Sequence, residues 1–192
     1  MKHDKNIYEE KNILMSKLYS IIKRLIDEAK QVGFSEHEAW EIFLQVIKHP
    51  DVFKRIVGYY REHLAQALLE REGFEMLHHK GAPYDYLAMK NGKKYLIEVK
   101  SSKHCSLKKL HIDYYLAKWV EGYEVLFVFV KEKAICPLEE LLLQALARHM
   151  IEYDAKLLVH ALKVCRETKR IPVDVYRKIP SELKGYLGKF VE

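Results

Sequence analysis

The sequence has few of the residues that mark disulfide-stapled, thiolate-metal or membrane proteins. Only three cysteines occur in 192 residues, and no two of them form a CxxC pair. A disulfide framework and a four-thiolate iron–sulfur cluster both need more cysteines, so neither is expected. No apolar run approaches the roughly eighteen residues that a membrane-spanning helix needs. The first residues carry acids before any apolar run and lack a small-residue cleavage site, so we expect a cytoplasmic protein with no membrane partner.

Several common binding signatures are also missing from the sequence. It has no GxxxxGKS/T phosphate-binding loop, and we therefore expect no nucleotide cofactor. Its histidines do not have the spacing of a recognised zinc site. It contains no recognition-helix, zinc-finger or ribonucleoprotein motif for reading bases. Any selectivity for nucleic acid is therefore expected to be for shape or branching more than for base sequence.

The composition itself favours a folded protein with room for a polyanionic partner. Hydrophobic residues make up 49% and charged residues 31% of the chain, which is typical of one globular domain with appendages. Lysine and arginine number 33 against 27 acids, a formal net charge of +6. The positive charge is concentrated between Lys90 and Lys109, where seven lysines accompany one acid, Glu98. Such a run is either a solvated surface or a contact for phosphates.

The first part of the chain is expected to be helical. Apolar residues recur every three or four positions over residues 7–31, which predicts a long amphipathic helix. Ser35 and Glu38 form a capping-box pattern at the start of a second helix, and Asp51 has the position of a cap for a third. We expect residues 1–56 to form a helical amino-terminal extension packed on the core.

The middle of the chain combines strand and helix patterns. Residues 57–131 contain a predicted helix at about 59–72, three strand-like runs, a helix near 107–120 and a fourth strand. The strand-like runs are, in order, FEMLHH, YDYLAMK, KYLIEVK and YEVLFVFV. The order α-β-β-β-α-β predicts an α/β fold with a four-stranded mixed sheet, covered by helices on both faces.

Residues 132–192 are expected to form a helical carboxyl-terminal extension. A leucine-rich helical stretch begins at Cys136 and Pro137 and runs to about Thr168, and short irregular pieces follow it. The apolar stripes of the two extensions suit two arrangements. They pack either on the core of their own chain or against a second copy in a homodimer.

The Asn-Gly dipeptide at 91–92 predicts a two-residue hairpin turn, because both central positions of such a turn need a positive φ. If Lys90 pairs with Lys93 across this turn, Asp85 falls directly opposite Glu98. Facing residues have Cβ atoms about 4.5–5.5 Å apart, where two carboxylates repel each other in a partly buried site. A divalent cation between Asp85 and Glu98 removes that repulsion.

A lysine joins the two carboxylates on the same face of the hairpin. Strand alternation places Lys100 two residues beyond Glu98, with its side chain on the same side. Mg²⁺ is usually held by one or two carboxylates together with waters and a substrate phosphate. A lysine beside the metal can orient the attacking water and stabilise charge on the phosphate. These groups are the parts of a site for metal-assisted phosphodiester hydrolysis.

Together these residues resemble the PD-(D/E)XK nuclease superfamily, and in particular the archaeal Holliday-junction resolvases. The resemblance covers about residues 58–130, and the order and spacing of its motifs fit. Its elements are Gly58 with Glu62 and Leu64 in the first helix, Gly73 and Phe74 before the first strand, Asp85 in the second strand, and Glu98, Val99 and Lys100 in the third.

The resemblance implies a Mg²⁺-dependent DNA endonuclease in which Mn²⁺ can substitute. By resemblance, Asp85 and Glu98 bind one or two metal ions, Lys100 positions the attacking water, and Glu62 is an outer metal ligand. Cutting two strands symmetrically implies a homodimer. The expected substrate is duplex or branched DNA such as a Holliday junction, and the expected processes are DNA recombination and repair.

The same resemblance gives the lysine-rich segment a role next to the metal site. Its phosphate contacts are expected to be Ser101, Ser102, Lys103, Lys108 and Lys109. Two other functions remain open at this point. One is a restriction-type or general DNA nuclease, and the other is a non-catalytic DNA-binding protein that keeps a nuclease-like core.

Overall fold

The computed structural model describes residues 2–48, 52–79, 83–101, 111–148 and 150–192. The chain forms two compact units, residues 1–64 and residues 65–192, and each is described by itself. Helix α3 (Val52–Arg71) begins in the first unit and ends in the second. In the described part of the chain, no helix is both long enough and apolar enough to cross a membrane.

The first unit contains α1 (Lys2–Gln31), α2 (Glu36–Val46) and the start of α3. The predicted capping box at the start of α2 is confirmed. The Glu38 N–H donates to the Ser35 hydroxyl at 3.2 Å, and the Ser35 N–H donates to the Glu38 carboxylate at 2.7 Å. These bonds satisfy two backbone donors that the first turn of a helix leaves without partners.

One element of the first part was predicted wrongly. The expected third helix and the expected helix at 59–72 are a single helix, α3. The apolar pattern changes near Gly58, but a glycine within a helix costs only about 1 kcal/mol, so the helix continues through it. Asp51, the expected cap, lies outside the described residues.

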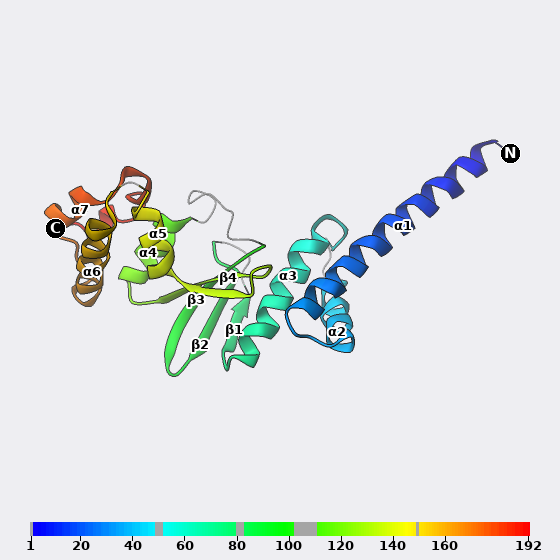
Figure 1. The fold of residues 1–192 in the computed structure, drawn as a ribbon, viewed down its shortest axis with the longest axis horizontal. Helices are drawn as coiled ribbons and strands as arrows, with labels where there is room; N and C mark the ends of the chain where they lie inside the picture. Colours follow the sequence, from blue (N-terminus) through cyan, green and yellow to red (C-terminus); the bar gives the residue numbers. More distant parts are fainter. Residues whose placement is uncertain (1, 49–51, 80–82, 102–110, 149) are drawn as a thin grey trace. The chain divides into compact units, whose positions relative to one another are not determined.

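The second unit is built on a five-stranded mixed sheet with the order β1-β2-β3-β4-β5 (Figure 1). Its strands are β1 (Glu75–His79), β2 (Tyr86–Lys90), β3 (Lys93–Lys100), β4 (Glu124–Phe129) and β5 (Ala134–Pro137). β3 and β4 are parallel, and the other neighbouring pairs are antiparallel. Helix α4 (Ile112–Val120) lies in the connection between the two parallel strands, as a crossover requires.

The α/β class and the mixed sheet are confirmed, but the prediction of four strands is wrong by one. The missed strand, β5, has four residues. The turn that leads into it has Lys133 at a φ of 51°, where a glycine or asparagine would have been a recognisable signal. In the sequence, β5 is therefore hard to distinguish from the start of the helix that follows it.

The predicted hairpin register is confirmed. Asn91 and Gly92 have φ values of 52° and 75°, as a type I′ turn requires. Lys90 pairs with Lys93, and Tyr86 pairs with Ile97. A slip of one residue would move every side chain to the opposite face, so this register fixes which residues of β3 lie together.

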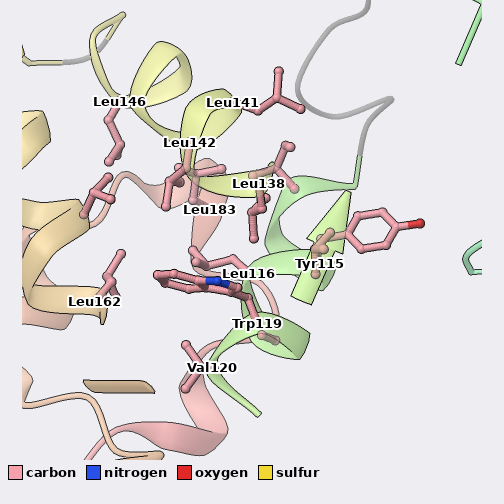
Figure 2. Close-up of a cluster of buried hydrophobic side chains, with 14 of the residues drawn as sticks. Tyr115, Leu116, Trp119, Val120, Leu138, Leu141, Leu142, Leu146, Leu162 and Leu183 are labelled. Atoms are coloured by element: carbon pink, nitrogen blue, oxygen red, sulfur yellow. The ribbon is translucent and has the colours of Figure 1, made fainter. Parts of the chain in front are cut away.

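The carboxyl-terminal helices form a layered group. They are α5 (Leu138–Leu146), α6 (Glu152–Thr168) and α7 (Val173–Lys178), followed by the 3-10 turns η2 (Ser181–Leu183) and η3 (Gly188–Phe190). Helix α5 packs on β4 and β5, α6 packs on α4 and α5, and α7 packs on α6. Figure 2 shows the leucines of α5 next to Leu116 and Trp119 of α4. The cluster also includes Leu96 on β3 and Phe127 on β4. Glu98 is the next residue after Leu96 on the same face of β3.

Candidate active site

The candidate site lies where β2 begins and β3 ends, within residues 65–192. Asp85 immediately precedes β2, and Glu98 and Lys100 belong to the last part of β3. The Asp85 N–H donates to the Ile97 carbonyl at 3.0 Å, and Ile97 is also the partner of Tyr86. The regular register therefore ends at Tyr86, and Asp85 does not pair with Glu98 as predicted; two residues of one strand facing one residue of the other is the pattern of a β-bulge. The Asp85 carboxylate accepts a 2.7 Å hydrogen bond from the Val99 N–H. Asp85 is therefore fixed to the backbone of β3 between Glu98 and Lys100.

Glu98 is the one charged side chain that is buried in the described part of the chain, with 6% of its surface exposed. A buried carboxylate is costly unless its oxygens have partners. The Lys100 ammonium donates to Oε1 of Glu98, and the Tyr115 hydroxyl donates to Oε2. Each carboxylate oxygen therefore has one hydrogen-bond partner and keeps a further lone pair.

Lys100 connects the buried carboxylate to the surface. The side chain of Lys100 is 25% exposed, whereas that of Glu98 is 7% exposed. An ammonium has three N–H donors, and one of them is used by Glu98. Lys100 can therefore bind Glu98 and still offer donors to a water or a phosphate at the opening of the site.

Tyr115, on α4, is a site residue that the sequence interpretation missed. Its side chain is fully buried, and its ring makes an edge-to-face contact with Phe127, with 5.1 Å between the ring centroids. Its hydroxyl also lies 2.9 Å from the Pro83 carbonyl oxygen, so the phenol proton has two neighbouring acceptors. Figure 2 shows Tyr115 pointing away from the labelled leucines, with its oxygen at the far end of the ring.

The electrostatic surroundings keep Tyr115 protonated. Burial strongly raises the pKa of its phenol, and the negative charges of Glu98 and Asp85 raise it further. A neutral phenol is a hydrogen-bond donor to a carboxylate at any ordinary pH. Tyr115 therefore donates a hydrogen bond to Glu98 and holds its carboxylate in place. The only signal for this role in the sequence is a tyrosine, instead of a leucine or phenylalanine, on the buried face of α4.

The carboxylates fit a magnesium ion in number and type. The Asp85 carboxylate is bonded to the N–H of Val99, the residue after Glu98, so both acids lie at the same end of β3. No group of three or more histidine, cysteine, aspartate or glutamate side chains that could hold a metal is found within the described ranges. Two carboxylates are nevertheless sufficient for Mg²⁺, which takes its remaining ligands from water and phosphate.

The other predicted site residues lie in the first unit, directly after β3, or outside the described residues. Glu62 lies on α3, in the unit of residues 1–64, and its role as an outer ligand stays a prediction. Ser101 follows β3 directly, and its carbonyl accepts a 3.3 Å hydrogen bond from the Lys131 N–H. The remaining expected phosphate contacts lie outside the described residues, and they are Ser102, Lys103, Lys108 and Lys109.

Comparisons of the chain with family models, curated proteins and solved structures found no significant match.

Proposed function

We propose that the chain is a Mg²⁺-dependent DNA endonuclease with a PD-(D/E)XK-like core. The observation that carries this proposal is the buried Glu98 carboxylate, held between Lys100 and Tyr115 and next to Asp85. A buried ion pair is weak evidence for stability, because apolar residues of similar size stabilise a core at least as well. The arrangement is better explained by chemistry at the end of β3.

Each residue of the cluster has a role in phosphodiester hydrolysis. Asp85 and Glu98 would hold Mg²⁺, or Mn²⁺ in its place, and the ion, when bound, supplies positive charge that neutralises the scissile phosphate. Lys100 orients the attacking water with its remaining donors and stabilises charge on the phosphate. Tyr115 fixes the position of the Glu98 carboxylate.

The proposed substrate is branched DNA, and the proposed active form is a homodimer. Branched DNA, such as a Holliday junction in recombination or repair, suits a chain without a base-reading motif. Two cuts related by symmetry require two copies of the site, which a homodimer supplies. Residues 102–110, between β3 and α4, contain further lysines that would bind phosphates beside the site.

A cleavage assay on several DNA forms tests the proposal. A labelled four-way junction, a matched linear duplex and a single strand are incubated with Mg²⁺, Mn²⁺ or EDTA. Wild type is compared with Glu98→Ala. We expect metal-dependent cuts at paired positions of the junction, no cuts with Glu98→Ala, and DNA binding retained by that variant.

Other outcomes of this assay point to the alternative functions. Equal cutting of linear duplex and junction would indicate a restriction-type or general nuclease. DNA binding without cleavage in any metal would indicate a non-catalytic DNA-binding protein. Cleavage retained by Glu98→Ala would show that the site is assigned wrongly.

A further inference from the structure

Three tyrosines that hydrolysis does not use gather beside the proposed active site. Tyr84 directly precedes Asp85, Tyr114 directly precedes Tyr115, and Tyr186 lies in the carboxyl-terminal segment. The ring centroid of Tyr114 lies 5.2 Å from that of Tyr115 and 5.6 Å from that of Tyr186. Burial chiefly raises the pKa of the Tyr114 phenol, and the nearby Tyr84 contributes to this. We call Tyr84, Tyr114 and Tyr186 the tyrosine cluster.

The backbone before Tyr186 lies against α4. Gly185 lies against α4, where a Cβ atom would meet the end of the Asp113 side chain at 2.4 Å from Oδ2. Leu183 and Leu187 are buried on either side of Tyr186. Tyr186 as a residue nevertheless remains 53% exposed. The fold therefore holds a large aromatic side chain at the surface, in contact with Tyr114.

The geometry and charge around the cluster suit an unpaired base. The rings of Tyr114 and Tyr186 meet edge to face, at an interplanar angle of 86°, so this contact does not occupy both faces of either ring. The Lys118 ammonium lies 5.9 Å from the centre of the Tyr114 ring, and Lys184 is two residues before Tyr186. Exposed aromatic rings combined with lysines are how proteins bind unpaired nucleotides, with the bases stacked and the phosphates paired.

We propose that the tyrosine cluster stacks an unpaired base of the DNA substrate beside the scissile phosphate. The inference rests on the proposed nuclease function, since Glu98 and Tyr115 connect the cluster to that site. It narrows the substrate to DNA with unpaired nucleotides next to the cut, as in a flap, a gap or an opened branch point. Bases within a continuous duplex have both faces covered by their neighbours and offer no face to Tyr186.

A binding experiment without metal tests the stacking separately from cleavage. A single-stranded oligonucleotide containing 2-aminopurine, whose fluorescence falls on stacking, is titrated with protein in EDTA. Wild type is compared with Tyr186→Ala, Tyr186→Phe and Tyr19→Ala. Tyr19 is the matched control, because it is 69% exposed on α1 and has no role in the site. We expect quenching with wild type, with Tyr186→Phe and with the control, and binding about tenfold weaker with Tyr186→Ala.

A cleavage arm with Mg²⁺ separates this inference from the proposed function. We expect Tyr186→Ala to cut a flapped duplex about tenfold more slowly than wild type at limiting protein, with linear duplex unaffected. If Tyr186→Ala matches wild type in quenching and in flap cleavage, the stacking inference is wrong and the nuclease proposal stands. If wild type cuts no DNA but shows quenching that depends on Tyr186, the nuclease proposal is wrong and stacking stands. If wild type neither cuts nor quenches, both are wrong.

Discussion

Glu98 occupies a core position at which an uncharged side chain would stabilise the fold equally well. It lies on β3 next to the fully buried core positions Leu96 and Ile97, and the bonds from Lys100 and Tyr115 offset its desolvation without providing a clear gain in stability. Glutamine has nearly the same shape and can still accept the Tyr115 hydrogen bond. Removing the charge should therefore leave the fold intact.

Glu98→Gln should change the free energy of unfolding by less than about 2 kcal/mol, because the charged partner, Lys100, is partly exposed and can be hydrated. Urea denaturation followed by circular dichroism measures the change. A loss of cooperative unfolding in Glu98→Gln would instead identify Glu98 as a structural ion-pair residue.

Asp85 provides a second prediction, on metal binding. A ligand that binds only the native state raises the melting temperature, by an amount that grows with the logarithm of its concentration relative to Kd. Added Mg²⁺ should therefore raise the melting temperature of wild type, and Asp85→Asn should remove this shift. Asp27→Asn, at an exposed position of α1, is the control and should keep the shift. Equal shifts in all three proteins would argue against Asp85 as a ligand.

Tyr115 provides a third prediction, because it acts through Glu98. Tyr115→Phe keeps the ring contact with Phe127 and removes only the hydroxyl. We expect kcat for cleavage to fall about 10- to 100-fold, as for other residues that orient a metal ligand, with little change in KM. Tyr176→Phe, a partly buried tyrosine elsewhere in the same unit, is the control. If the melting temperature of Tyr115→Phe falls so far that unfolding explains the lost activity, Tyr115 contributes to stability alone.

At the scale of elements, the β2–β3 hairpin sets the spacing of the site. Gly92 has a φ of 75°, which an L residue adopts at a cost of roughly 1–2 kcal/mol. Gly92→Ala should therefore lower the stability of the unit by about that amount, measured by urea denaturation. Gly58→Ala is the opposite control, because Gly58 lies within α3 and an added Cβ meets nothing within 4 Å. It should raise stability by about 0.5–1 kcal/mol, and equal effects of the two substitutions would contradict the turn assignment.

The elements also show what the sequence could and could not predict. The Asn-Gly turn determines the pairing of β2 with β3, so the shared face of Glu98 and Lys100 was predictable from local rules. The exact position of Asp85 was not, because its N–H bonds to Ile97 and the regular pairing ends one residue earlier, at Tyr86.

Tyr115 lies on α4, the helix that connects β3 to β4. Its contact with Glu98 depends on how α4 packs on the sheet. Periodicity identifies the buried face of α4 but does not indicate which residue of β3 lies beneath it. β5 was missed because its turn has no glycine or asparagine.

At the scale of the whole molecule, the proposed homodimer needs a surface. One side of α6 packs on α4 and α5, while Tyr153, Leu157 and Val164 remain 70%, 51% and 53% exposed on the same helix. Their spacing of four and seven residues places them on one stripe. This exposed stripe suits a contact with a second copy of α6.

Leu157→Glu should therefore convert a dimer to a monomer, because two buried carboxylates would face each other near a twofold axis. Size-exclusion chromatography with light scattering measures the mass. We expect wild type at twice the mass of one chain and Leu157→Glu at the mass of one. Leu44→Glu, at an equally exposed position of α2, should remain a dimer. If wild type has the mass of one chain, the homodimer proposal is wrong.

The most direct test of the central claim is the single-turnover rate of DNA strand cleavage with Mg²⁺ by wild type, Glu98→Gln and Glu124→Gln. Glu124 is a carboxylate on the neighbouring strand β4 that pairs with Arg166, so it controls for loss of charge on the sheet. We predict that Glu98→Gln cleaves about a hundredfold or more slowly than wild type, and that Glu124→Gln cleaves at the wild-type rate. Equal rates for wild type and folded Glu98→Gln would contradict the account.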